Sequence, residues 1–231
     1  MLRELIQFLK GTNQDESLAG NLDRMIQESA ELVHLAGDAY FHRTPETPAY
    51  GDLKARDKGI NQLQHQIRKD ALVEAVAATR PFNLPFYLSL MNIVKDLERL
   101  GDYAKDLAGL QDHAGPAADP DYQSLAREAE ELVQALSPVM KAADQLKAVE
   151  LIEAGKDIRR DLTAIQRRLL KGDENLSWSP ADILALHYYI RIISHTLNVL
   201  STLVTPLHHM DSLGRKHLLP EVREKLRALP S

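Results

Sequence analysis

Two acidic side chains one helical turn apart form the most chemically suggestive pair in the sequence. Glu98 and Asp102 lie in the stretch KDLERLGDYAKDL, where apolar residues recur every three or four positions and predict one buried helix face. Like charges at this spacing cost roughly 0.2–0.5 kcal/mol, and Gly101 beside them costs about 0.8–1.0 kcal/mol relative to alanine. We therefore expect the two carboxylates to chelate a hard cation or to bind a cationic group of a partner, with Gly101 admitting a neighbouring backbone.

An ordinary solvated helix face explains the same residues differently. Lys95, Arg99 and Lys105 are interspersed with the acids, and each pair of opposite charges on neighbouring turns stabilises a helix by about 0.2–0.5 kcal/mol. Arg99 either contacts a partner or pairs with a neighbouring acid and holds the cluster in shape. The spacing alone leaves both interpretations open.

Two further pairs of oxygen-bearing side chains share the one-turn spacing. Asp57 and Asn61 lie in ARDKGINQLQHQI, and Asp157 and Asp161 lie in GKDIRRDLTAI. Side chains four residues apart lie on the same face of a helix. Each pair is therefore predicted to present its oxygen atoms together.

Glu31 and His34 form the Glu-x-x-His element of di-iron helical bundles, which require a second copy of that element. The sequence has no second copy, because neither His65 nor His195 follows a glutamate at that spacing. An ordinary polar helix face is the favoured interpretation.

Three histidines near the carboxyl end, His208, His209 and His217, lie in LHHMDSLGRKH. We expect solvated side chains there rather than metal ligands.

The composition restricts the class of protein. A chain of 231 residues with 44% hydrophobic residues can bury one large core or two smaller ones. The net charge of -5 argues against nucleic-acid binding, and the absence of cysteine excludes disulfides and thiolate metal sites. The sequence also lacks a glycine-rich phosphate loop and a nucleophile elbow. We expect a cytoplasmic protein that is not an enzyme.

The amino-terminal segment, residues 1–14, is amphipathic. Its apolar residues are interrupted by charged ones, and no signal-peptide cleavage pattern follows. We expect it to pack on the protein rather than on a bilayer surface. No run of 18 apolar residues occurs, so no membrane span is predicted.

Helical periodicity dominates the chain, and no convincing alternating strand interrupts it. The expected helices cover about 15–42, 52–79, 85–112, 122–143, 146–170 and 180–208. Pro138 is expected to kink the fourth of them. The fold class is therefore all-α, with two tandem three-helix bundles at 15–112 and 121–208 and a tail helix within 211–231.

The stretch NIVKDLERLGDYAKDL closely resembles the signature of the PhoU family of bacterial phosphate-signalling regulators. The resemblance is specific at 92–107 and extends weakly over about 17–208. It implies an internal repeat of two three-helix bundles. It also implies a regulator of phosphate uptake and phosphate-starvation signalling that forms a homodimer. The partners that it implies are the ATPase subunit of a phosphate ABC transporter and a sensor histidine kinase.

The resemblance further implies metal binding, because PhoU-like proteins hold metal clusters through an acid, three residues and an aspartate. Glu98 with Asp102 and Asp157 with Asp161 match that motif, and Asp57 with Asn61 matches it partly. Such oxygen ligands suit a divalent or trivalent ion such as Mg, Ca, Mn, Zn or Fe.

The second repeat departs from the family pattern, because Ile190 and Ser194 stand where its third helix would carry acids. Asp157 and Asp161 alone are expected to bind metal weakly. The alternative function is a metal-independent helical accessory or scaffold protein of a phosphate permease, in which Glu98 and Asp102 contact the arginines of a partner.

Overall fold

The computed structural model describes residues 16–42, 47–77, 83–113, 120–172 and 178–228. Within these residues all regular structure is helical, which confirms the all-α prediction. The long helices are α2 (Glu16–Phe41), α3 (Tyr50–Ala77), α4 (Leu84–Ala108), α5 (Pro120–Gln134), α7 (Gln145–Leu170) and α8 (Pro180–Ser201). The shorter helices are α6 (Leu136–Ala142) and α9 (Pro220–Arg227), with 3-10 turns η1 (Gln111–His113), η2 (Leu207–His209) and η3 (Arg215–His217).

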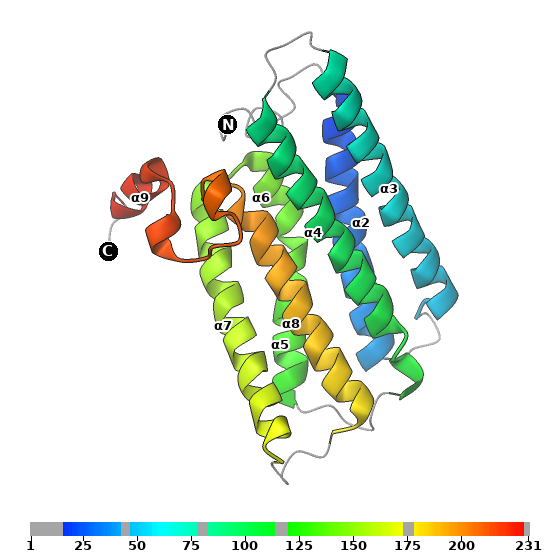
Figure 1. Ribbon diagram of the computed structural model, residues 1–231. Coiled ribbons are helices and arrows are strands. Elements are labelled where there is room, and N and C mark those ends of the chain that lie inside the picture. Colours follow the sequence, from blue (N-terminus) through cyan, green and yellow to red (C-terminus); the bar gives the residue numbers. More distant parts are fainter. Residues whose placement is uncertain (1–15, 43–46, 78–82, 114–119, 173–177, 229–231) are drawn as a thin grey trace.

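The helices form two sets of three, and α4 and α8 join the sets at the centre of the molecule (Figure 1). Helix α4 packs against α2, α3 and α8, whereas α8 packs against α4, α5 and α7. Helix α3 lies at one edge of the molecule, and α7 lies on the opposite side with α9 beyond it (Figure 1). One apolar core runs from Leu18 to Val222 and includes buried residues from both sets. The domain boundaries at 15–112 and 121–208 remain predictions.

Local sequence signals account for several helix starts. Asn83 caps α4 by accepting a hydrogen bond from the Phe86 amide, and Pro85 fits the first turn. Ser179 and Asp182 form a reciprocal capping box at the start of α8. These caps fix where the buried faces of α4 and α8 begin.

Two helix ends differ from the sequence-based expectation. Helix α8 ends at Ser201 rather than near 208, and turns follow it. Pro206 lacks an amide hydrogen and disfavours helical geometry at Thr205, so the helix cannot continue. Helix α4 ends at Ala108, with Gly109 as its C-cap, rather than near 112. The interruption expected at Pro138 falls slightly earlier, between α5 and α6 at Ala135.

The amino-terminal segment 1–14 lies outside the described residues. The tail helix expected within 211–231 is present as α9. No helix among the described residues combines the length and apolar character needed to cross a bilayer.

Candidate functional site

The predicted acids on α3 and α4 face one another where these helices pack. Asp57 is buried, with 6% of its surface exposed, and its Oδ1 atom has no hydrogen-bond partner in the described structure. A Cβ added to Gly101 would lie 3.2 Å from Asp57 Oδ1 and 3.1 Å from Ile60 Cδ1. Gly101 therefore leaves room for side chains of α3 rather than for the neighbouring backbone that we expected.

Lys105 and Arg99 neutralise much of this acidic cluster. The Lys105 ammonium lies 3.1 Å from Asp102 Oδ1 and 3.8 Å from Asp57 Oδ2, so it bridges the two helices. Arg99 donates to Asp102 Oδ2 at 3.0 Å, and its Nε lies 3.6 Å from Glu98 Oε2. In this arrangement Arg99 pairs with neighbouring acids, which is one of the two roles its spacing left open.

Burial leaves the cluster electrostatically strained. It raises the pKa of Asp57, while Lys105 opposes that shift and Asp102 adds to it. Burial also raises the pKa of Glu98, and the nearby Asp102 and Asp57 charges raise it further, against Arg99 and Arg68. The carboxylates of α3 and α4 therefore sense one another through space, and a further cation among them would relieve that repulsion.

The donor set fits a hard cation chemically. Asp57, Glu98 and Asp102 supply carboxylate oxygens, and the Asn61 amide already lies next to Asp57, with Nδ2 3.4 Å from Oδ2. The unpartnered Asp57 Oδ1 is a free acceptor for such an ion. Among the described residues, however, no three His, Cys, Asp or Glu side chains are arranged so that they could hold a metal ion. The Lys105 ammonium also lies among these acids. An ion would therefore have to displace the Lys105 ammonium.

The second predicted pair lies apart on α7. Arg160 bridges Asp157 at 2.5 Å and Asp161 at 3.0 Å, and about half or more of both acid side chains is exposed. On α8, Ser194 donates its hydroxyl to the Ile190 carbonyl within its own helix. Asp157 and Asp161 therefore lie on a solvated helix face, where Arg160 neutralises them.

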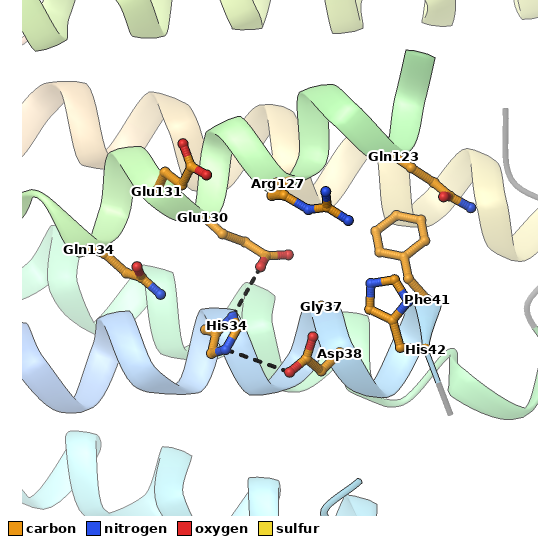
Figure 2. Close-up of a pocket in the computed structure, with 10 residues that line it drawn as sticks. All are labelled: His34, Gly37, Asp38, Phe41, His42, Gln123, Arg127, Glu130, Glu131 and Gln134. Atoms are coloured by element: carbon orange, nitrogen blue, oxygen red, sulfur yellow. Dashed lines mark hydrogen bonds and ion pairs between the residues drawn. The ribbon is translucent and has the colours of Figure 1, made fainter. Parts of the chain in front are cut away.

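A polar pocket between α2 and α5 was missed by the sequence analysis (Figure 2). Its volume is about 230 Å³, and both helices contribute charged side chains to it. The Glu130 carboxylate is buried between the two, where its Oε1 accepts a hydrogen bond from the Tyr189 hydroxyl at 2.7 Å. His34 Nδ1 lies 3.3 Å from Glu130 Oε2, and His34 Nε2 lies 3.6 Å from Asp38 (Figure 2).

Gly37 is what admits the Glu130 carboxylate. A Cβ at position 37 would overlap Glu130 Oε1 and would lie 2.8 Å from the Tyr189 hydroxyl. Burial raises the pKa of Glu130, while its hydrogen bonds to Tyr189 and His34 lower it. The only local signal for this arrangement was a glycine inside a helical pattern. His34 thus belongs to a hydrogen-bond network between α2 and α5.

A second buried polar contact joins α4 to α8. His195 Nδ1 lies 2.7 Å from Asp96 Oδ1, and both residues are less than 10% exposed. Asn198 donates to the same oxygen at 3.4 Å, and the Tyr103 ring stacks on the imidazole. This contact crosses between the two sets of helices, so it helps to hold them together.

The part of the chain that contains the α3–α4 cluster matches a known protein family. Residues 22–110, which contain this cluster, match the PhoU domain. The matched residues make up less than half of the chain. The resemblance to the PhoU family seen at residues 92–107 is thereby confirmed.

One relative and two solved structures are also similar to this chain. A phosphate-specific transport system accessory protein PhoU homolog from Synechocystis is 33% identical over 102 residues, which span 44% of this chain and 42% of the relative. The crystal structure of the phosphate transport system regulatory protein PhoU from Streptococcus pneumoniae covers 91% of this chain and is itself 95% covered, with a TM-score of 0.62 and 18% identity. PhoU from Pseudomonas aeruginosa covers 81% of this chain and is 94% covered, with a TM-score of 0.65 and 20% identity. At these identities the two structures show a shared fold.

Proposed function

We propose that this protein regulates phosphate uptake and phosphate-starvation signalling by binding other proteins. The observation that carries the proposal is the PhoU domain at 22–110, whose α3–α4 interface gathers Asp57, Glu98 and Asp102. The name of the Synechocystis relative, a phosphate transport accessory protein, supports the same role. The proposed partners are the ATPase subunit of a phosphate ABC transporter and a sensor histidine kinase, and the proposed assembly is a cytoplasmic homodimer.

A carboxylate metal site in the first three helices is part of this proposal. Asp57, Glu98 and Asp102, with the Asn61 amide oxygen turned inward, would hold the ion, and Lys105 would give up its place among them. A bound divalent or trivalent ion would supply positive charge that neutralises the repulsion between the carboxylates. The exposed Asp157 and Asp161 pair contributes little to it.

A metal-independent accessory protein of a phosphate permease is the second candidate. The specific observation in its favour is that Lys105 and Arg99 already neutralise the acids without a metal ion. In that case a partner's arginines would compete with Lys105 for Asp102.

Co-purification tests the proposed partners. The full chain and its Glu98→Ala/Asp102→Ala variant are each mixed with the ATPase subunit of a phosphate ABC transporter and with a sensor kinase. Under the proposal the wild-type chain retains at least one of these proteins. Retention of neither, by a folded wild-type chain, would reject the proposed partners.

Whether that retention needs metal separates the two candidates. Under the first candidate it is lost after chelation and restored by the metal. Under the second it persists in a chelator but is lost in the Glu98→Ala/Asp102→Ala variant.

A further inference from the structure

Three histidine rings gather at the surface where the chain leaves α8. The centroids of the His208 and His209 rings lie 4.3 Å apart, and those of His209 and His217 lie 4.2 Å apart. His208 and His209 belong to η2 and His217 to η3, so the imidazole rings bring two turns of the chain into contact. None of these residues takes part in the α3–α4 cluster or in the α2–α5 pocket.

The backbone around the rings is shaped to hold them together. The His209 amide donates to the Pro206 carbonyl, and the His217 amide donates to the Gly214 carbonyl, both at 2.8 Å. A Cβ on Gly214 would lie 3.3 Å from His217 Cδ2, which is tighter than ordinary contact. The absence of a side chain at 214 therefore leaves room for the His217 ring.

We propose that His208, His209 and His217 form a binding site for a divalent transition metal of the class that prefers imidazole, such as Zn²⁺ or Ni²⁺. Neutral imidazole nitrogens are favoured ligands of these ions, and short histidine-rich tracts commonly bind them. This site takes softer ions than the carboxylates of α3 and α4.

The donor nitrogens do not yet converge on one point. The rings stack at tilts of 44° and 49°, and the described residues contain no three ligand side chains already in metal-holding geometry. Convergence requires rotation about side-chain bonds, which residues at the surface can make. Lys216 opposes binding by its charge, whereas Arg215 lies 3.8 Å from Glu153 on α7.

A metal at these rings would fasten η2 to η3. The segment that follows η3 is tied to the turn after α8 by the Leu219 amide, which donates to the Val204 carbonyl at 2.9 Å. The ion would therefore stabilise the path by which the chain passes from α8 to α9. Hydrogen exchange of the Leu219 amide should slow when metal is bound.

Isothermal titration of the full chain with Zn²⁺ tests the proposal, with protein that carries no polyhistidine tag and has been freed of metal by a chelator. The key variant is His209→Gln/His217→Gln, and its matched control is His65→Gln/His187→Gln, which removes two exposed histidines elsewhere. The Glu98→Ala/Asp102→Ala variant separates this site from the carboxylates.

We expect one Zn²⁺ site that persists in the control and in the carboxylate variant and weakens by about tenfold or more in His209→Gln/His217→Gln. Equal Zn²⁺ affinity in that variant and in the wild type would overturn the proposal. So would the absence of Zn²⁺ binding by the wild type, or an equal loss in the His65→Gln/His187→Gln control.

Discussion

Replacement of Gly37 by alanine tests whether the buried Glu130 carboxylate is held as described. Alanine in place of glycine inside a helix normally stabilises it by about 0.8–1.0 kcal/mol. Here the added Cβ overlaps Glu130 Oε1 and lies 2.7 Å from its Cδ, so the carboxylate must leave the Tyr189 hydroxyl and His34. A buried hydroxyl without a partner costs about 1–3 kcal/mol, and the lost bond to His34 adds about 0.5–1.5 kcal/mol.

The net result expected for Gly37→Ala is destabilisation by about 0.5 to 3.7 kcal/mol. Urea denaturation followed by circular dichroism measures it. Gly20→Ala is the matched control, because Gly20 lies on the same helix and a Cβ there would meet nothing within 4 Å. The control should gain up to about 1 kcal/mol. If Gly37→Ala proved as stable as Gly20→Ala, the Gly37–Glu130–Tyr189 arrangement would be refuted.

Three further perturbations test other parts of the account. The raised pKa of Asp57 means that the folded state binds more protons than the unfolded state just above pH 3.8, so the free energy of unfolding should fall as pH rises there. Urea titrations at several pH values, with chelator present, should show that Asp57→Asn lacks this decrease. The same pH profile in Asp57→Asn and in the wild type would contradict the prediction. His195→Ala should lower the free energy of unfolding by about 2–4 kcal/mol in thermal and urea unfolding, because it leaves the buried Asp96 carboxylate poorly paired. The control His187→Ala, at an exposed position, should lower it by under about 0.5 kcal/mol. Equal losses in the two variants would count against the α4–α8 contact. Elemental mass spectrometry after chelation and reloading with Mn²⁺ should find metal in the wild type and less in Glu98→Ala/Asp102→Ala, and no difference between them would reject the carboxylate site.

Much of the fold follows from periodicity, because a helix buries side chains three and four residues apart. The apolar stripe through Leu97, Leu100 and Ala104 predicted α4, and all three residues are fully buried. The end of α8 was placed too late, because the apolar pattern continues through Leu203 and Val204 although Pro206 stops the helix. Both residues are buried, but they lie in turns, so their burial does not indicate a helix.

The site was predictable only where its geometry is local. Glu98, Gly101 and Asp102 share one helix, so their spacing indicated the repulsion and the approach of another part of the chain, but not that this part is α3. His34 and Glu130 lie 96 positions apart, and Asp96 and His195 lie 99 apart. These contacts depend on how α2 meets α5 and how α4 meets α8, which a helical repeat does not specify.

Control of a phosphate-starvation reporter tests the central claim most directly. The chain is expressed in a bacterium that lacks its own PhoU protein and is grown with abundant phosphate, and reporter activity is measured beside the amount of folded protein. The account predicts that the wild-type chain lowers the reporter activity and that the Gly20→Ala control does the same. Reporter activity that stays high while the folded chain accumulates would contradict a role in phosphate signalling.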